Sequence, residues 1–214
     1  VREVNTGLMV FPGDKLLKWL PLLKNRNSQK EYYLTDCVEM AAKEGLRVGC
    51  VNAPFSGDVL GVNDKSQLAA AERIFQHRTA LDLMNSGVTL LDPARLDVRG
   101  ELVCGHDVVI DVNCVFEGLV TLGDGVKIGP NNYVRDSCIG GNAEILPNCV
   151  IEDSIIGGSG IIGPFSRLRP GTGISDGVRV GNFVEIKNSM LGRASKVNHL
   201  AYIGDTELGD RVNI

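Results

Sequence analysis

The chain has 214 residues, of which 43% are hydrophobic and 22% are charged, and its formal net charge is −4. This length allows one large or two modest globular domains. The acidic balance argues against a broad surface for nucleic acid or anionic membranes, so any anionic ligand must be held by a local cluster of basic residues.

The sequence gives no sign of export or membrane insertion. It has no apolar run of the roughly 18 residues that would cross a membrane, and its start is unlike a secretory leader. Its six cysteines form neither a CxxC pair nor a Cys/His metal-binding spacing. We therefore expect a cytoplasmic protein with reduced thiols. Because residue 1 is valine and a repeat is still running at Ile214, we also expect a fragment.

Residues 1–64 have the pattern of a mixed α/β segment. A helix is expected after Asp14, interpreted as its N-cap, and Pro21 should kink or end it. A second helix is expected over 34–45, with a glycine as its C-terminal stop. Alternating apolar residues over 46–54 predict a strand. These elements alone make a poor core, so we expect the trailing part of a larger domain.

Residues 65–85 have helical periodicity, and Gly87 is expected to end the helix. The predicted apolar side of this helix contains Leu68, Ala71, Ile74, Phe75, Leu81 and Met84. We interpret 65–100 as a linker helix and connector between two domains, and His77 as a surface residue.

From about residue 101 an aliphatic residue returns every six positions, with four steps of five. The series is Ile110, Phe116, Leu122, Ile128, Val134, Ile139, Ile145, Ile151, Ile156, Ile162, Leu168, Ile174, Val180, Ile186, Leu191, Val197, Ile203, Leu208 and Ile214. Such a hexapeptide period predicts a parallel β-helix with three short strands per coil, here roughly six coils. The period does not fix the handedness of the winding.

The fourth residue after each aliphatic one is usually small, and strand alternation is expected to point it inward. On this count Cys114, Cys138 and Cys149 are core residues. Glu207 falls at the same kind of position, which predicts a local distortion or a buried polar contact there.

Register brings a basic pair together. Three repeat steps return the chain to the same face, so one face is expected to contain Leu168, Ile186 and Ile203. Their outward neighbours Arg169 and Lys187 should then lie about one strand spacing, ~4.8 Å, apart. Two like charges at that spacing are unfavourable unless an anion binds beside them. His199 falls at the corner that leads into this face, near Glu185 and Tyr202.

A phosphate clamp beside an imidazole favours chemistry on a small phosphorylated substrate. The alternative interpretation, a solvated corner with ordinary surface charges, stays open at this point. His106 has no matching basic column, so we interpret it as structural.

Several strings now indicate a family: "VNTG", "EYYLTD", "GVND", "DPARLDVRG", "IGPFSRLRPG", "GNFVEIKNSMLG", "KVNHLAYIGD" and "DRVNI". In order and spacing they resemble the bacterial bifunctional N-acetylglucosamine-1-phosphate uridyltransferase/glucosamine-1-phosphate N-acetyltransferase, along essentially the whole chain. The resemblance implies an α/β remnant of a Rossmann-like nucleotidyltransferase domain over 1–64, then the connector helix, then a left-handed β-helix over 101–214 that begins the acetyltransferase domain.

For the uridyltransferase reaction, the resemblance implies that Asn5, Tyr33 and Thr35 contact the UDP-sugar. It also implies that Asn63 is a Mg²⁺ ligand that contacts the nucleotide sugar. An asparagine alone is a weak ligand for this ion, which prefers carboxylates, phosphates and water.

For the acetyltransferase reaction, the resemblance implies that Arg169 and Lys187 bind the sugar phosphate. It makes His199 the proton acceptor, and Tyr202 and Asn213 substrate contacts. An amine that attacks a thioester must lose a proton, so an imidazole near it is a sensible general base.

The resemblance further implies UTP, UDP-N-acetylglucosamine, glucosamine-1-phosphate and acetyl-CoA as ligands, Mg²⁺ as cofactor, and a homotrimer. The family's glycine-rich nucleotide loop and its acetyl-CoA-binding coils are expected before Val1 and after Ile214. We therefore expect the 214-residue chain to be inactive in both reactions by itself.

Three other classes compete with this interpretation. A β-helical carbonic anhydrase needs several histidines around a metal, which the two histidines of the repeat region do not provide. A different sugar-1-phosphate nucleotidyltransferase with a regulatory β-helix would leave the clamp and histidine unexplained. A non-catalytic β-solenoid would make every outward residue incidental.

Overall fold

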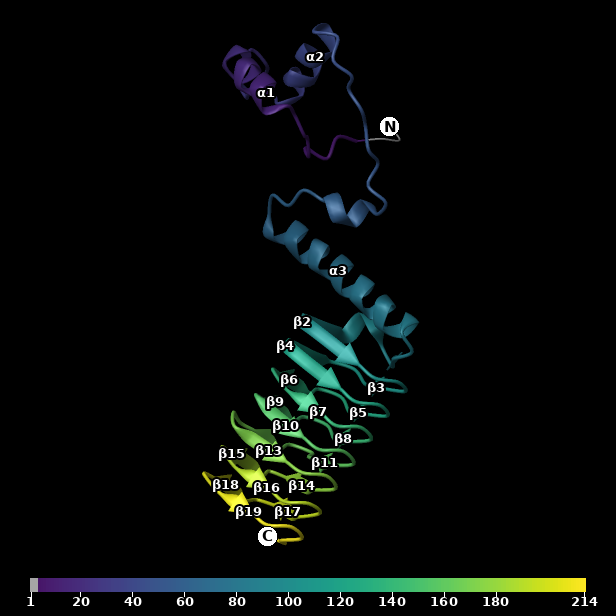
Figure 1. Cartoon of the computed structure of the whole chain (residues 1–214), viewed down its shortest axis with the longest axis vertical. Helices are drawn as coiled ribbons and strands as arrows, with labels where there is room; N and C mark the ends of the chain where they lie inside the picture. The colour runs from purple at the N-terminus through teal and green to yellow at the C-terminus, as the bar shows by residue number, and fades with distance from the viewer. Residues whose placement is uncertain (1–3) are drawn as a thin grey trace. The chain divides into compact units, whose positions relative to one another are not determined.

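A computed structural model describes residues 4–214 of the chain (Figure 1). The chain divides into two compact units, the first ending at Ala71 and the second running from Glu72 to Ile214. None of the described helices is both long enough and apolar enough to cross a membrane.

The first unit is helical. Its elements are α1 (Gly13–Trp19), the 3-10 turn η1 (Leu20–Leu22), α2 (Thr35–Lys43) and the 3-10 turn η2 (Ser56–Val59). A small core of Trp19, Cys37 and Ala41 joins α1 to α2. Pro21 lies in the turn that ends α1, as predicted, and Gly45 closes α2 with a φ of 72°.

Two predictions for this unit are wrong. The N-cap of α1 is Pro12, without a side-chain hydrogen bond; Asp14 lies in the first turn, where its charge favours the helix dipole. The strand expected over 46–54 is not formed: the segment is extended, and Val51 is 95% exposed. A strand needs a neighbour to bond with its backbone, and the described residues before α3 supply none.

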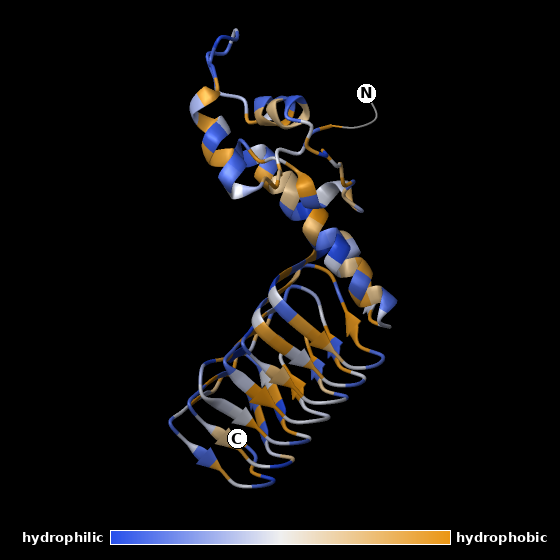
Figure 2. Ribbon diagram, turned by 45° about the horizontal axis from the view of Figure 1, so that its top comes forward, coloured by the Kyte–Doolittle hydropathy of each residue, from blue (hydrophilic) through white to orange (hydrophobic). Residues whose placement is uncertain are grey.

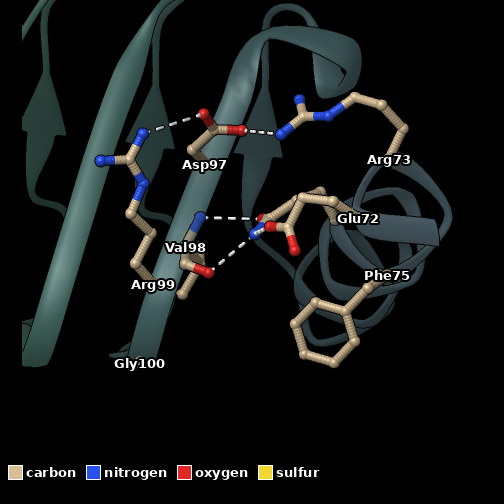
Figure 3. Close-up of a pocket in the computed structure, with 8 residues that line it drawn as sticks. Glu72, Arg73, Phe75, Asp97, Val98, Arg99 and Gly100 are labelled. Atoms are coloured by element: carbon tan, nitrogen blue, oxygen red, sulfur yellow. Dashed lines mark hydrogen bonds and ion pairs between the residues drawn. The ribbon is translucent and has the colours of Figure 1, made fainter. Parts of the chain in front are cut away.

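Helix α3 (Lys65–Asn85) has the predicted bounds, and Gly87 follows it with a φ of 100°. Its predicted apolar side is wrong, because Leu68, Phe75 and Leu81 are exposed. The buried residues are Gln76, Ala80 and Leu83. They face inward because the helix packs beside strand β2 (Leu96–Cys104), whose Val98 exchanges two hydrogen bonds of 2.8 Å with the Gln76 amide (Figure 3).

The second unit is a parallel β-helix with three faces, and the short turn η3 (Pro93–Arg95) lies in its first coil. What we call face 3 is a seven-stranded parallel sheet, one strand more than the six coils expected. Its strands are β1 (Thr89–Leu90), β3 (Val109–Ile110), β5 (Lys127–Ile128), β8 (Glu144–Ile145), β11 (Ile161–Ile162), β14 (Arg179–Asn182) and β17 (Lys196–His199). Regular pairing thus begins at Thr89.

The other two faces are branches of one twelve-stranded sheet. The long strands β2 (Leu96–Cys104) and β4 (Cys114–Leu122) run around the corner between them, and β4 pairs with both β6 and β7. Face 1 continues with β6 (Tyr133–Arg135), β9 (Val150–Glu152), β12 (Arg167–Leu168), β15 (Glu185–Lys187) and β18 (Tyr202–Gly204). Face 2 continues with β7 (Cys138–Ile139), β10 (Ser154–Ile156), β13 (Thr172–Ile174), β16 (Met190–Leu191) and β19 (Glu207–Leu208).

The predicted aliphatic series forms the core. From Ile110 to Val197 every member is buried to 4% exposure or less, and Ile203 is 8% exposed. Figure 2 shows these apolar residues recurring along the strands of successive coils. The connector helix and the hexapeptide β-helix of the predicted fold class are confirmed.

All four five-residue steps cross the corner between face 1 and face 2, and they correct two predictions. Side chains two residues apart in a strand point to the same side, so the inward small residue lies two positions before the next aliphatic residue. In a five-residue step this is the third residue after the preceding aliphatic one. Ser137, Ser154 and Ser189 occupy this position and are buried. Cys138 and Glu207 point outward and are exposed, whereas Cys114 and Cys149 are core residues as predicted.

The buried hydroxyls at this corner form a ladder of hydrogen bonds. Ser154 Oγ donates to Glu152 O at 2.7 Å, while the Ser154 N–H donates to Ser137 Oγ at 3.1 Å. Ser189 repeats the arrangement two coils further on, with Lys187 O at 2.7 Å and the Thr206 N–H at 3.1 Å. The hydroxyls replace backbone partners where the turn interrupts the sheet.

Candidate functional site

The predicted register of face 1 is confirmed. Leu168 pairs with Ile186, which pairs with Ile203. The next residues extend the pairing, because the Arg169 N–H donates to Ile186 O at 2.8 Å and Lys187 pairs with Gly204. Arg169 and Lys187 are therefore outward neighbours on adjacent coils.

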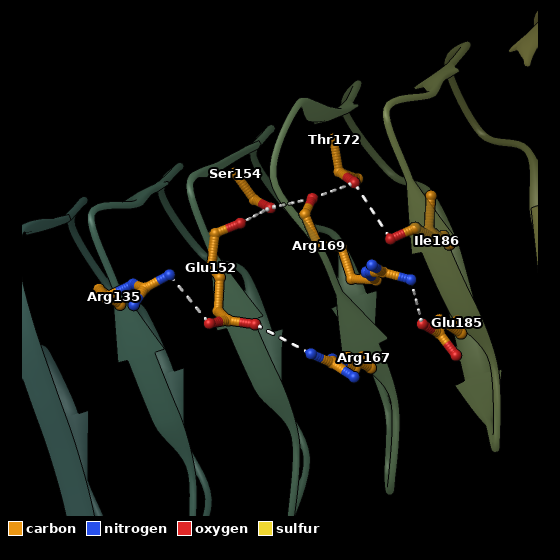
Figure 4. A network of polar contacts seen from close by, with 8 residues as sticks. All are labelled: Arg135, Glu152, Ser154, Arg167, Arg169, Thr172, Glu185 and Ile186. Atoms are coloured by element: carbon orange, nitrogen blue, oxygen red, sulfur yellow. Dashed lines mark hydrogen bonds and ion pairs between the residues drawn. The ribbon is translucent and has the colours of Figure 1, made fainter. Parts of the chain in front are cut away.

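The outward column that contains this pair alternates in charge before it reaches the pair. In order along the β-helix the column is Arg99, Glu117, Arg135, Glu152, Arg169 and Lys187. Glu152 is 16% exposed and bridges Arg135 at 3.0 Å and Arg167 at 3.5 Å (Figure 4). The alternation breaks at Arg169 and Lys187, where two cations follow each other.

The two cations differ in their partners. Arg169 Nη1 donates to Glu185 Oε1 at 3.0 Å, and both side chains are more than a third exposed. Lys187 forms no ion pair with any residue that the structure describes. One partnered and one unpartnered cation next to each other leave a local excess of positive charge that an exposed anion such as phosphate can neutralise.

Tyr202 and His199 flank this pair. Tyr202 pairs with Glu185 on face 1, and its phenol ring lies across Gly204, the residue beside Lys187. His199 ends β17 on face 3, in register with Asn182, and is exposed at the corner that leads to face 1. In the described chain its imidazole has no hydrogen-bond partner, so both ring nitrogens are open to a ligand.

Asn213 lies on face 3, where it pairs with Lys196 and its Oδ1 accepts a hydrogen bond from Asn198 Nδ2 at 3.0 Å. It is one coil beyond His199 and on a different face from Arg169. Of the five acetyltransferase candidates, the structure thus brings Arg169, Lys187 and Tyr202 together on face 1, and places His199 and Asn213 on the adjoining face.

The four uridyltransferase candidates lie in the first unit and are exposed. Asn5 Oδ1 caps the Gly7 N–H at 3.0 Å, Tyr33 bonds to Gln29, and Thr35 opens α2. The Asn63 N–H donates to Gln67 Oε1 at 2.7 Å. No hydrogen bond joins the four candidates to each other in the part of the chain that the structure describes.

The surroundings of Asn63 do not form a magnesium site. Among residues 4–214 there is no group of three or more His, Cys, Asp or Glu side chains that could hold a metal. The neighbouring Asp64 carboxylate is used at the start of α3, where it accepts the Gln67 N–H at 2.8 Å and the Ser66 hydroxyl at 2.7 Å. These bonds lower the pKa of Asp64, the Gln67 N–H contributing most.

Sequence reasoning missed the charge alternation of face 1 and the bridging role of Glu152. The signal was present, because Arg99, Glu117, Arg135 and Glu152 recur at intervals of 17 or 18 residues with opposite signs. It could have been found by reading outward columns over the whole repeat instead of over the last coils.

The fold and these sites define a hexapeptide-repeat β-helix protein with two adjacent cations on one face, beside a corner histidine. The sequence comparisons identify relatives along the whole chain. The chain is 56% identical over all 214 residues to the "Bifunctional protein GlmU" of Azoarcus sp. (strain BH72), and 55% identical to that of Paraburkholderia phytofirmans. It is a homologue of the GlmU proteins along its whole length, and it spans 47% of the length of these two relatives.

Two other comparisons also found matches. A family profile described as "GMPPB C-terminal domain" matches residues 98–180. Among solved structures, the acetyltransferase domain of PglB from Neisseria gonorrhoeae in complex with acetyl coenzyme A is 18% identical, with a TM-score of 0.38. That match covers 61% of this chain and 62% of the other. Homology to GlmU supports the left-handed winding expected for the β-helix.

Proposed function

We propose that this chain is part of a bifunctional enzyme of UDP-N-acetylglucosamine biosynthesis. Residues 101–214 begin the domain that transfers acetyl from acetyl-CoA to glucosamine-1-phosphate. Residues 1–64 belong to the domain that transfers uridyl from UTP to N-acetylglucosamine-1-phosphate, and 65–100 connect the two. Homology to the GlmU proteins over the whole chain supports this assignment.

One observation supports the acetyltransferase site most strongly: the charge alternation of face 1 breaks at Arg169 and Lys187, beside a corner histidine. The two cations bind the sugar phosphate and so hold the sugar in place, which is catalysis by positioning. Tyr202, whose ring lies across Gly204, contacts the same substrate. Asn213 contacts it from the next coil.

The reaction needs one proton acceptor. The amine of glucosamine-1-phosphate attacks the thioester carbonyl of acetyl-CoA, a C–N bond forms, the C–S bond breaks, and coenzyme A leaves as the thiolate, which then takes up the proton that the amine lost. His199 accepts the proton that the amine loses, since an unpartnered imidazole can act as a base near neutral pH. No covalent acyl-enzyme is required.

The uridyltransferase half is proposed from homology. Asn5, Tyr33 and Thr35 contact the UDP-sugar. Asn63 would offer Mg²⁺ one oxygen, and the other ligands would have to be phosphates, water and a carboxylate that the described residues around Asn63 do not supply. We also propose a homotrimer, and a cytoplasmic location in keeping with the unpaired cysteines.

The test uses a chimera in which these 214 residues replace the matching segment of the Azoarcus GlmU protein. We expect His199→Ala to lower the rate of acetyl transfer by about 100-fold or more and to leave uridyl transfer unchanged. The matched control His77→Ala should leave both rates unchanged. Lys187→Gln should raise KM for glucosamine-1-phosphate more than it lowers kcat. Acetyl transfer that persists in His199→Ala would refute the assignment of the base.

A second candidate is favoured by the match to the GMPPB C-terminal domain profile. It is a sugar-1-phosphate nucleotidyltransferase whose β-helix is regulatory. On this alternative the unaltered chimera would transfer uridyl but no acetyl group, and replacing Arg169 or Lys187 would change only the response of uridyl transfer to an effector.

A further inference from the structure

The corner between face 1 and face 2 has one residue in the left-handed backbone region in each coil from β4 onward, with φ between 42° and 80°. This residue follows the outward charged column of face 1 by one or two positions. In chain order these corner residues are Gly118, Asp136, Asp153, Gly171, Asn188 and Asp205. The coils of Arg169 and Lys187 thus interrupt a run of aspartates with a glycine and an asparagine.

The backbone does not require an uncharged residue at position 188. Asn188 has a φ of 43°, between the 42° of Asp153 and the 45° of Asp136. Asparagine and aspartate both tolerate this conformation. Asn188 Nδ2 donates to Asp205 Oδ1 at 2.7 Å, and the reverse pair, a carboxylate followed by an amide, would form the same bond. The asparagine therefore differs from the neighbouring aspartates in its charge and not in its geometry.

Gly171 has a steric reason of its own. Its corner is one residue wider, and a Cβ there would lie 3.0 Å from Asn188 Oδ1. Together the two positions leave the corner uncharged in both coils that carry the cation pair.

An aspartate at this corner reaches the cation that precedes it. Asp136 Oδ2 lies 4.0 Å from Arg135 Nε, one residue before it. Lys187 precedes Asn188 in the same way, and both corners are crossed in five residues. A carboxylate at position 188 would therefore lie within reach of Lys187 Nζ, which has no ion pair among residues 4–214.

The uncharged corner sets the net charge of the site. Arg169, Lys187 and Glu185 together have one excess positive charge, and Glu185 bonds to Arg169 at 3.0 Å (Figure 4). A further carboxylate beside Lys187 would cancel this excess. Since the attraction of an anion depends on the charges within a few ångströms of it, the site would then lose its net attraction for an anion.

We propose that Asn188 determines the specificity of the face 1 site for a phosphorylated sugar, because its uncharged amide leaves Lys187 free to bind the phosphate. The inference rests on the proposed function, which takes the phosphate of glucosamine-1-phosphate as the anion that Arg169 and Lys187 hold. Asn188 acts through Lys187 and is not itself a substrate contact.

The test exchanges the two side chains of the hydrogen-bonded pair in the GlmU chimera. Asn188→Asp combined with Asp205→Asn keeps the net charge and the amide–carboxylate bond, and it moves the carboxylate by one coil, about 4.8 Å, toward Lys187. We expect KM for glucosamine-1-phosphate to rise about threefold at low ionic strength with kcat unchanged, an effect of the size of one exposed ion pair. The preference for glucosamine-1-phosphate over glucosamine, measured as the ratio of their kcat/KM values, should fall by a similar factor. Salt at about 1 M should remove the difference, because it screens charges more than about 3 Å apart.

Three further variants separate charge from structure. Asn188→Asp alone should raise KM at least as much as the exchange, which repeats the test in a second variant. Asp205→Asn alone leaves position 188 uncharged and should not raise KM. Asn142→Asp adds the same charge at a left-handed residue, with a φ of 57°, on the corner between face 2 and face 3, and should leave KM unchanged. The melting temperature checks that each variant is folded, and uridyl transfer should be unchanged in all of them.

The outcomes distinguish the role of Asn188 from the proposed function. An exchange variant with the wild-type KM, in a chimera where Lys187→Gln does raise KM, would overturn the role of Asn188 and leave the proposed function standing. An equal rise in Asn142→Asp, or a rise that persists in about 1 M salt, would also overturn it. If Lys187→Gln itself leaves KM unchanged, the phosphate clamp is refuted, and this inference with it.

Discussion

Replacing Ser189 by alanine tests how the β-helix maintains its backbone hydrogen bonds at the corner between face 1 and face 2. Ser189 is 2% exposed, donates its hydroxyl to Lys187 O at 2.7 Å, and accepts the Thr206 N–H at 3.1 Å. The alanine variant leaves the half-buried Thr206 N–H without a partner, whereas Lys187 O keeps the hydrogen bond from the Asp205 N–H at 3.1 Å. A buried polar group left unsatisfied costs about 1–3 kcal/mol, and since this donor is half-buried we expect the β-helix to lose about 1–2 kcal/mol of unfolding free energy.

Urea denaturation followed by far-ultraviolet circular dichroism measures this loss, and hydrogen exchange should show faster exchange at the Thr206 amide. The matched control is Ser175→Ala, a half-buried serine whose side chain forms no hydrogen bond within the described residues; its stability should stay within about 0.5 kcal/mol of wild type. An equal effect of both substitutions, or no change in Thr206 exchange in Ser189→Ala, would contradict the hydroxyl ladder.

Three further predictions concern the ladder, the first unit and the thiols. Gly192→Ala should destabilise the β-helix by more than 1 kcal/mol because its Cβ would overlap the Gly209 backbone, while Gly209→Ala, with open space around its Cβ, should be close to neutral in the same urea titration. Hydrogen bonds from Lys15 and, to a lesser extent, Trp19 lower the pKa of Glu44. Their stabilising effect is therefore present at pH values above the ordinary pKa of glutamate and is lost as the pH falls through the lowered pKa. Fluorescence of Trp19 should report this acid transition, and Glu44→Gln should remove it. Burial raises the pKa of Cys104 and Cys114 to about 11, so a thiol reagent at pH 8 should modify the exposed Cys50 and Cys138 first, as peptide mass mapping over time would show; equal rates at all four would contradict the burial of the first two.

The sequence predicted the β-helix well because a hexapeptide period has one structural solution. Each aliphatic residue from Ile110 to Ile203 is in the core, and the pairing of Leu168 with Ile186 followed from counting three steps. The prediction failed for Cys138 and Glu207 because it counted forward from the preceding aliphatic residue. Each of the two directly precedes the next aliphatic residue in the same strand, so its side chain points to the opposite side, outward.

The helical part was harder to predict for a different reason. The apolar residues Leu68, Phe75 and Leu81 gave a plausible buried side, but the packed side of α3 is chosen by β2, whose Val98 needs two hydrogen bonds that only an amide such as that of Gln76 can complete. The failure of the strand over 46–54 is similar, since pairing depends on a neighbour and cannot be read from the segment alone.

The candidate site was predictable in part. Register placed Arg169 beside Lys187, but it could not show that Glu185 pairs with Arg169 and leaves Lys187 as the cation without an ionic partner in the described structure. Which side chains pair depends on rotamers, and sequence spacing is silent about these.

The corner between face 1 and face 2 also bears on how this fold tolerates changes in length. It is crossed in five residues in four coils and in six between Phe116 and Leu122 and between Leu168 and Ile174, whereas the other two corners take six residues in every coil of the repeat. A single residue can therefore be inserted or deleted at this corner while the strands on either side keep their inward residues. The same change at the corner of His199 would reverse the alternation of the following strand and turn its core residue toward solvent. Length variation among natural relatives should therefore gather at the hydroxyl-lined corner, leaving the histidine corner fixed in length.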